Sequence, residues 1–569
     1  MLALLFIGCC VILGLAYVFY GKFLERRLGV HESHPVPAHI LEDGVDYVPT
    51  TDPILFGHHF SSIAGAGPIV GPIIAGLAFG WGPALLWIIL GSIFIGGTHD
   101  MTSLVASVRH QARSVGEICR DLLSPLAYYM FLVFIWFTLV YVLIVFTDLT
   151  ALSYAPVVGA NASPQEMQDQ LHQGGAVATA SLLYIVLAVV FGISVYKWRF
   201  STLKASLVFI PLVFIALLIG YRFPLLPGML PVFMGSTINA WKAILLVYCF
   251  IASILPVWIL LQPRDYLSSF LLYSSLLFGG VGLVLSGVTG NAPIHFAMFK
   301  GFNDPQLGFI FPALFITVAC GAVSGFHSIV ASGTTSKQLS NEMSARKIGF
   351  GSMMVEAVLA VIALAAIMIL SKEPGTQPVS IFANGLGHFM SVLGVGKNFA
   401  ATFGLMAVST FLLTTLDTCT RLCRFVFEEM FNIRGLMARV VGTLATLALP
   451  AFMLFQTLPG PGGAPISAWK AIWPAFGATN QLLAALALLV VFAWLKKEGK
   501  KTLYVVLPLM FMSATTLTAL TQLVIRNLFH GGSMLVGSIC LVLDLLAVAL
   551  IVDTVWNLFL KKKPAVVRA

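Results

Sequence analysis

Ionisable side chains occur inside apolar segments of this 569-residue chain, where each needs a partner or a function. An imidazole gains and loses a proton near neutral pH, and a buried carboxylate requires a cation, a proton or a basic partner. The alternative for each histidine is a neutral ring bonded to a backbone carbonyl. The predicted proton-coupling residues are His58, His59, His99 and Asp100. The expected partner of Asp100 is His99 or Arg109.

The stretch FGHHFSSIAGAGPIVGP, from Phe56 to Pro72, also contains residues that interrupt helices. Gly65, Gly67 and Pro68 fall together at its centre, and glycine and proline destabilise a helix interior. Such an interruption persists in a membrane only where it lines a protein-enclosed site, because unpaired backbone groups are costly in lipid. The freed N–H groups of half-helices suit a small carboxylate. The alternative is a continuous helix whose glycines allow close packing.

A second interruption is predicted by the sequence Ser253-Ile254-Leu255-Pro256 within the segment 239–262. The segments 55–80 and 239–262 are predicted to cross the membrane in opposite directions, each beginning a unit of five spans. Two such units form an inverted repeat, with substrate bound between the interrupted helices. The predicted substrate site comprises Ser61, Ser62, Ala64, Gly65, Ala66, Gly67, Pro68, Ser253 and Pro256.

Hydroxyl groups in the stretch GFHSIVASGTTSKQ offer a different coupling ion. Ser332, Thr334 and Thr335 could complete a sodium site, because hard cations prefer oxygen ligands. The alternative is ordinary bonding of these hydroxyls to helix carbonyls. We expect H⁺ rather than Na⁺ to be the coupling ion, with no cofactor, and His327 in the same stretch is a further proton candidate.

The composition is that of a membrane protein. The chain is 59% hydrophobic and 10% charged, and its mean hydropathy is +0.95. These values predict an all-α polytopic membrane protein with about fifteen transmembrane helices. If the N-terminus lies outside and the C-terminus is cytoplasmic, most of the 32 Lys and Arg residues fall on the inner side. The net charge of +9 therefore needs no nucleic acid to explain it.

Sequence motifs of common enzyme classes are missing. The sequence contains no GxSxG elbow, no phosphate-binding loop followed by Lys and Ser or Thr, and no HExxH motif. We therefore expect a protein that is not an enzyme. The lack of a nucleotide-binding motif also argues against a primary pump, which leaves transport driven by an ion gradient.

Long strings across the chain are similar to those of a known family. They are HHFSSIAGAGPIVGP, GTHD, ILPVWILLQPRDYL, SGTTSKQL, LDTCTRLCRF and FGATNQLLAALAL. From residue 1 to about 560 the chain resembles the carbon starvation protein A family. The resemblance implies a multi-pass protein of the bacterial inner membrane, similar to the amino acid–polyamine–organocation transporters and their inverted five-helix repeat. It also implies an N-terminal transporter domain over 1–380 and a C-terminal five-helix domain over 381–569.

Members of that family are described as peptide transporters, and some relatives as proton-coupled pyruvate symporters. The sequence thus predicts a secondary active transporter that imports small carboxylates, such as pyruvate or short peptides, during carbon starvation. Its partners would be that substrate and the lipid bilayer, and its oligomeric state stays open. The alternative is a membrane starvation sensor or scaffold, which is expected to carry a soluble output domain or a partner-binding tail.

Overall fold

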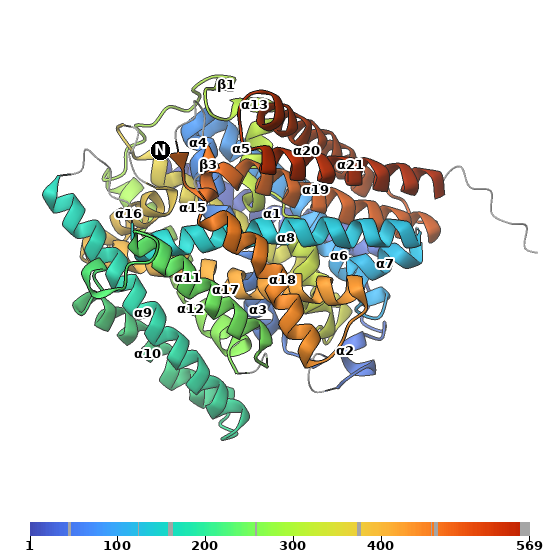
Figure 1. Ribbon diagram of the computed structural model, residues 1–569, viewed down its shortest axis with the longest axis horizontal. Coiled ribbons are helices and arrows are strands. Elements are labelled where there is room, and N and C mark those ends of the chain that lie inside the picture. Colours follow the sequence, from blue (N-terminus) through green and yellow to red (C-terminus); the bar gives the residue numbers. More distant parts are fainter. Residues whose placement is uncertain are drawn as a thin grey trace, which may run out of the picture.

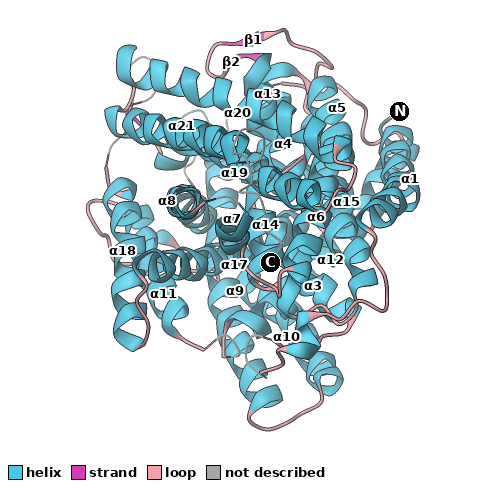
Figure 2. Cartoon of the chain, turned by 90° about the vertical axis from the view of Figure 1, so that its right-hand side faces the viewer, coloured by secondary structure: helices cyan, strands magenta, loops and turns pink. Residues whose placement is uncertain are grey.

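The computed structural model describes residues 1–43, 47–122, 124–156, 163–256, 259–372, 377–456, 458–459 and 465–557. Nearly all regular structure in these residues is helical (Figure 1, Figure 2). The described strands form two short antiparallel pairs, β1 (Asn303–Asp304) with β2 (Gly308–Phe309) and β3 (Leu458–Pro459) with β4 (Pro465–Ile466). The predicted all-α class is therefore confirmed.

The count of spans agrees with the sequence prediction. In the described residues, 14 helical segments are long and apolar enough to cross a bilayer, and the bent pair α3–α4 raises the number to 15. The helices of these spans are α1 (Leu2–Leu28), α3 (Asp52–Ile63), α4 (Gly67–Phe79), α5 (Trp81–Gly91), α6 (Gly97–Arg109), α8 (Pro125–Tyr154), α9 (Pro164–Tyr196), α10 (Thr202–Arg222), α11 (Thr237–Ile254), α12 (Leu261–Val288), α13 (Ile310–Val318), α14 (Gly325–Gly333), α15 (Ser352–Met368), α17 (Lys397–Phe431), α18 (Leu436–Leu454), α19 (Ala468–Lys497), α20 (Leu503–Phe529) and α21 (Met534–Val555). Three shorter helices are α2 (Pro37–Ile40), α7 (Val115–Leu122) and α16 (Pro378–Ser391).

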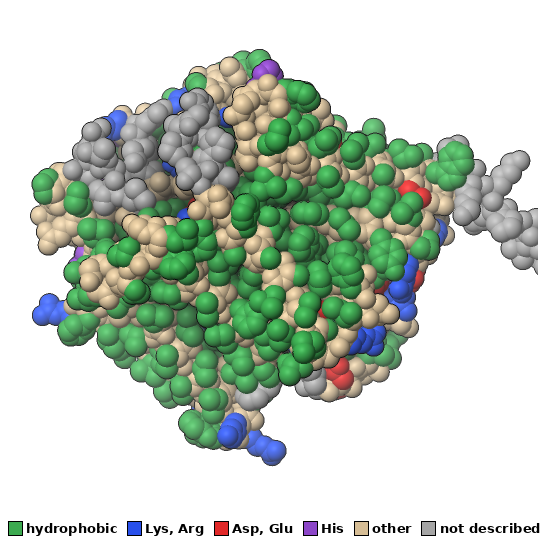
Figure 3. Space-filling model, viewed as in Figure 1, with side chains coloured by type: hydrophobic (Ala, Val, Ile, Leu, Met, Phe, Trp, Pro, Cys, Tyr) green, Lys and Arg blue, Asp and Glu red, His purple; other side chains and the backbone are tan. Residues whose placement is uncertain are grey.

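Some spans lie at the centre of the molecule and others form its rim. We compared the most apolar 18-residue stretch of each span. In α17, α19 and the segment 310–337, 94% of that stretch is buried, whereas in α1 only 28% is buried. Apolar side chains also cover much of the outer surface (Figure 3). Such a surface is expected where helices face lipid. The central helices carry the polar residues that the sequence pointed to.

The first predicted interruption is present. Helices α3 and α4 are bent by 43° at the residues between them. The backbone N–H of Gly65 turns back to the carbonyl of Ile63 at 2.8 Å, so the helical bonding pattern ends there. Pro68 lies in the first turn of α4, where a helix tolerates proline because that N–H has no helical acceptor.

The second predicted interruption lies between two spans and not inside one. Helix α11 is continuous from Thr237 to Ile254, and Ser253 lies in its last turn while Pro256 follows its end. The interrupted span is instead 310–337, in which α13 and α14 are separated by the 3₁₀ turn Ala319–Gly321. Ala319 has a φ of 46°, outside helical geometry. Proline at 256 marks the end of a helix, whereas the real interruption contains only small residues and valine.

The two interrupted spans run in opposite directions, because six spans lie between α3–α4 and α13–α14. The predicted arrangement of two five-span units as an inverted repeat stays a prediction. The division of the chain near residue 380 stays a prediction.

Candidate functional site

The two interrupted spans touch each other close to their interruptions. A Cβ atom added to Gly67 would lie 2.5 Å from the Sγ of Cys320, and one added to Gly71 would lie 2.4 Å from the carbonyl oxygen of Val318. Only glycine permits so close an approach. Both interpretations of the glycine-rich stretch thus hold, since the helix is interrupted and its glycines also pack tightly.

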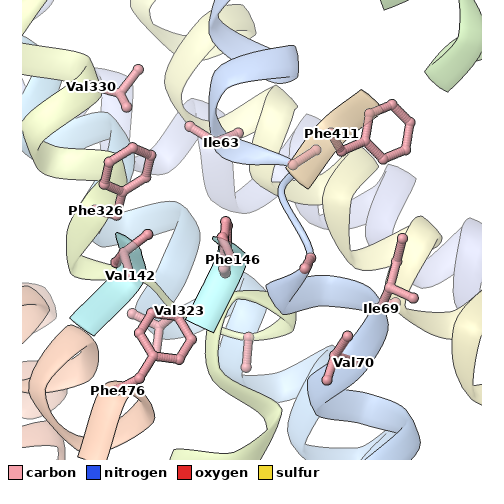
Figure 4. Close-up of a cluster of buried hydrophobic side chains, with 14 of the residues drawn as sticks. Ile63, Ile69, Val70, Val142, Phe146, Val323, Phe326, Val330, Phe411 and Phe476 are labelled. Atoms are coloured by element: carbon pink, nitrogen blue, oxygen red, sulfur yellow. The ribbon is translucent and has the colours of Figure 1, made fainter. Parts of the chain in front are cut away.

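Apolar side chains surround the first interruption (Figure 4). Ile63 and Ile69 flank it on α3 and α4, and Phe146 of α8 and Phe476 of α19 lie beside it. The rings of Phe146 and Phe476 are 6.0 Å apart, and all four side chains are buried. In this conformation the first interruption is buried, mostly among apolar groups, and the hydroxyl of Thr415 lies 2.9 Å from a Cβ atom added to Gly65.

The structure separates the predicted substrate residues into two groups. Those from Ser61 to Pro68 lie together at the first interruption, where the Ser62 hydroxyl donates to the carbonyl of His58 at 2.8 Å. Ser253 lies elsewhere, with its hydroxyl 3.1 Å from that of Thr443. Helix α11 packs against α8, α17 and α18, whereas α3 packs against α12, α14 and α17. The structure therefore does not place Ser253 and Pro256 beside the first interruption.

A group of four buried ionisable residues lies next to the contact between the interrupted spans. We call His99, Asp100, His327 and Glu356 the His–carboxylate cluster; each of them is 0% exposed. The two oxygens of Asp100 accept from Nδ1 of His99 at 2.7 Å and from Nδ1 of His327 at 2.8 Å. His327 lies in the first turn of α14, directly after the second interruption. The cluster thus joins α6, α14 and α15.

Glu356 is the least satisfied member of this cluster. Its Oε2 lies 3.5 Å from Nε2 of His327, which is an ion-pair distance. Among the described residues, neither of its oxygens has a hydrogen-bond partner. A buried carboxyl group without donors is stable only when it carries a proton or faces a cation.

The partner predicted for Asp100 is half correct. His99 does bond to it, but Arg109 pairs with Glu342 instead, through Nε and through Nη2 at 3.0 Å. The second partner is His327, 227 positions away in the chain.

The adjacent histidines of α3 face different neighbours. His59 is fully buried, and its Nδ1 lies 2.8 Å from the hydroxyl of Thr335. His58 has its Nδ1 3.8 Å from a carboxylate oxygen of Asp265 on α12. Helix α3 therefore lies between two buried polar groups.

The group next to His58 is the arginine cluster, which comprises Arg264, Asp265, Asp417 and Tyr248. Arg264 is 0% exposed and pairs with Asp417 and, at 2.8 Å, with Asp265. Its Nη1 also donates to the hydroxyl of Tyr248 at 2.9 Å, and that hydroxyl donates to Asp417 at 2.9 Å. The guanidinium is thus held by carboxylates from two helices and by a tyrosine from a third.

The hydroxyls of the predicted sodium site are engaged in ordinary bonds. Ser332 donates to the carbonyl of Ser328 at 2.7 Å, and Thr334 donates to that of Val330 at 3.0 Å. Thr335 faces His59. Within the described ranges, no group of three or more His, Cys, Asp or Glu residues is arranged to hold a metal ion. The hydroxyls of Ser332 and Thr334 follow the pattern that the alternative predicted.

Sequence reasoning missed two central residues. Glu356 is a single glutamate in the apolar run MMVEAVLAVIALAAIM, and a lone carboxylate in a span is a signal that could have identified it. Arg264 follows closely on the predicted span 239–262, which suggests a connection, although the structure buries it completely. Its partners could not be read from nearby sequence, because Asp417 is 153 positions away.

Comparisons with known proteins agree with these observations. A sequence model of the family described as carbon starvation protein CstA matches residues 1–375 and 374–519. The peptide transporter CstA of Campylobacter jejuni is 31% identical over 575 residues, which cover 90% of this chain and 78% of that protein. The pyruvate/proton symporter BtsT of Escherichia coli is 30% identical over 600 residues, which cover 89% and 79%.

Among solved structures, the manganese transporter of Eremococcus coleocola in complex with an aromatic bis-isothiourea substituted compound aligns with a TM-score of 0.43. The identity is 13%, and the alignment covers 91% of this chain and 98% of that one. The family match and the two relatives show that this multi-pass membrane protein belongs to the carbon starvation protein CstA family.

Proposed function

We propose that this protein is a proton-coupled secondary transporter that imports a small carboxylate, either a pyruvate-like acid or a short peptide. The relatives are named as transporters of these two kinds, which supports a transport function and not an enzymatic one. The observation that carries proton coupling is the position of Asp100. It is held between histidines of α6 and α14, beside the contact of the two interrupted spans.

The hydrogen bonds define which atoms would carry the proton. Asp100 accepts from Nδ1 of both His99 and His327, so Nε2 is the atom of each ring that can gain or lose a proton. Nε2 of His327 faces Glu356 at 3.5 Å. One added proton can therefore reside on His327 or on Glu356, and either position changes the charge of a fully buried cluster.

The cluster is positioned to link this charge to movement. Each of its members belongs to a helix that begins near an irregular turn. A π-helical turn, Ser92–Gly96, precedes α6, and another, Arg346–Gly351, precedes α15. Such turns are frequent at functional sites. A change in the attraction between α6, α14 and α15 would shift the second interruption, whose Cys320 contacts Gly67.

The direction of transport follows from the proposed topology. With the N-terminus outside and the C-terminus cytoplasmic, in the bacterial inner membrane, protons would enter from the outer side together with the substrate. A transporter of this kind rocks one group of helices against another around a fixed site. The buried, mostly apolar surroundings of Gly65 would then correspond to a closed conformation.

The test is uptake into proteoliposomes of labelled pyruvate and of labelled glycylglycine, under an imposed pH gradient and separately under a sodium gradient. We expect uptake that follows the pH gradient, acidic outside, and is abolished by a protonophore. Uptake that needs sodium would overturn proton coupling and direct attention to Ser332, Thr334 and Thr335. Uptake of neither compound under either gradient, with protein inserted and folded, would favour the sensor.

A further inference from the structure

A large cavity opens at the end of the molecule where α4 and α20 end and α19 begins. Its volume is about 810 Å³, and it is also lined by the connection that contains β1 and by the start of α16. On the topology proposed above, this end faces the outside. The cavity is separate from the His–carboxylate cluster, none of whose residues lines it.

Basic side chains dominate the mouth of this cavity. Those that line it are Lys300, Lys470, Arg526 and His530. Asp304 is the one acidic residue among the described residues of the lining, and its Oδ1 already accepts the backbone N–H groups of Gln306 and Leu307, at 2.9 and 2.8 Å. A concave surface with this charge attracts anions.

Two of the basic groups keep donors for a ligand. Arg526 uses Nη1 on the carbonyl of Gln306 at 2.8 Å, and a guanidinium has five N–H donors in a planar fork that matches a carboxylate. Lys470 lies over the ring of Trp469, with its Nζ 5.7 Å from the ring centre. This cation–π contact occupies none of the three ammonium donors in a hydrogen bond.

Two tryptophans form part of the wall of the cavity. Trp469 and Trp473 line it, and each is 2% exposed. Their indole N–H groups are buried and have no hydrogen-bond partner in the part of the chain that the structure describes. The cavity thus combines basic side chains with an aromatic wall.

We propose that this cavity is an external capture site for a carboxylate anion, either a monocarboxylate or the C-terminal carboxylate of a short peptide. The proposal rests on the proposed function for its orientation and its ligand class. Arg526 and Lys470 hold the carboxylate at the mouth, and the two tryptophans form the wall behind it. The captured anion then moves from this cavity to the transport site.

A column of aromatic rings lies between this cavity and the first interruption. Trp473 contacts Phe476 with ring centres 5.3 Å apart, and Phe476 contacts Phe146 at 6.0 Å. A Cβ atom on Gly65 would lie 3.1 Å from Phe146. A continuous chain of three ring contacts therefore connects the cavity to the interruption in this conformation.

The start of this column is anchored to two other spans. The backbone N–H of Trp469 donates to Asp148 of α8 at 2.9 Å, and Asp148 pairs with Lys242 of α11 at 3.0 Å. A movement of α8 relative to α19 would therefore move the rings that separate the cavity from the interruption. Such a movement would open a path for the bound carboxylate from the capture site to the first interruption.

The test compares the double variant Lys470→Gln/Arg526→Gln with the control Arg222→Gln, which changes an exposed residue outside the cavity. Binding of labelled pyruvate and of labelled glycylglycine to full-length protein in nanodiscs is measured by equilibrium dialysis without any gradient. Glycylglycine amide, which lacks the carboxylate, serves as competitor control. Two lost charge-assisted bonds should weaken binding of both ligands by about tenfold or more.

The outcomes separate the two proposals. Binding that is weakened in the double variant and normal in Arg222→Gln supports the capture site, even if no gradient drives uptake. Weakened binding of pyruvate alone would assign the site to monocarboxylates, and weakened binding of glycylglycine alone to peptides. Equal binding by the double variant and the wild type would overturn the capture site, as would efficient competition by the amide, while gradient-driven uptake could still be present.

Discussion

Two fully buried charged clusters lie on either side of α3, and they differ in what their cation can do. The arginine cluster contains a guanidinium, which stays protonated in proteins. This guanidinium pairs with two carboxylates, those of Asp265 and Asp417. The His–carboxylate cluster contains imidazoles, which gain and lose a proton near neutral pH. Its Glu356 has no hydrogen-bond partner among the described residues.

The arginine cluster therefore keeps its cation, whereas the His–carboxylate cluster can change its charge by gaining or losing a proton. Both clusters bear the cost of removing charge from water, which only good pairing offsets. In the arginine cluster, ion pairs and hydrogen bonds connect α11, α12 and α17, although Nε of Arg264 and one oxygen of Asp417 have no hydrogen-bond partner among the described residues. In the His–carboxylate cluster, the gain or loss of one proton changes the attraction among Asp100, His327 and Glu356. His58 and His59 place α3, and with it the first interruption, between the two.

The largest effect is expected from breaking the fixed cluster. Arg264→Met leaves Asp417 and Asp265 buried without a cation, which should cost about 3–5 kcal/mol of stability. The measurement is thermal unfolding of the purified protein in detergent, together with the yield of folded protein. Arg222→Met, at the exposed end of α10, is the control and should unfold like the wild type.

A second variant keeps this prediction open to refutation. Arg264→Met/Asp417→Leu removes the charge together with its main partner and should recover part of the lost stability. If Arg264→Met alone unfolds at the temperature of the wild type, the arginine cluster is not a structural element. The arginine cluster could then no longer be contrasted, as a structural element, with the His–carboxylate cluster.

The next effect concerns function and not stability. Asp100→Asn keeps the size and the acceptor oxygen of the side chain but removes the charge that two histidines share. Gradient-driven uptake should fall by about 100-fold or more. The protein should remain folded, with substrate binding intact in nanodiscs. Uptake at the rate of the wild type would remove Asp100 from the coupling mechanism.

Glu356→Gln should give a smaller loss. The amide resembles a permanently protonated carboxyl group, so the cluster can no longer pass a proton between His327 and this position. We expect uptake under a pH gradient to fall by roughly tenfold, while exchange of substrate at equal pH continues. A loss of both processes in equal measure would indicate damage to the substrate site instead of to coupling.

Some of this arrangement was accessible from the sequence and some was not. Hydropathy and the distribution of Lys and Arg were sufficient for the number of spans, because each span must be long and apolar by itself. The glycines and proline at 65–68 identified the first interruption, because these residue types disfavour a helix whatever their tertiary contacts. The second interruption, at Ala319, escaped because neither its residues nor their order exclude a helix.

The partners of charged residues depend on tertiary packing. The bond from His99 to Asp100 could be anticipated from adjacency, but the bond from His327 could not. The same holds for Arg264 and Asp417. The sequence could therefore name candidate proton-coupling residues without showing that a second, permanently charged cluster lies next to them.

The contact between the interruptions offers a more modest perturbation. Gly67→Ala would place a Cβ atom 2.5 Å from Cys320, and the strain should cost about 1–3 kcal/mol and weaken binding of labelled pyruvate. Gly14→Ala on α1 is the matched control, because nothing lies within 4 Å of its added Cβ. Equal pyruvate affinity in Gly67→Ala and Gly14→Ala would show that this contact only packs the helices.

The smallest effect is expected from the hydroxyls next to the His–carboxylate cluster. Ser332→Ala/Thr334→Ala removes two bonds to helix carbonyls, and each should contribute less than about 1.5 kcal/mol. Uptake under a pH gradient should be within a factor of about two of the wild type, since such bonds compete with backbone pairing and add little. The measurement is uptake with and without sodium. A variant that loses sodium-dependent uptake would transfer the coupling role from the histidines to these hydroxyls.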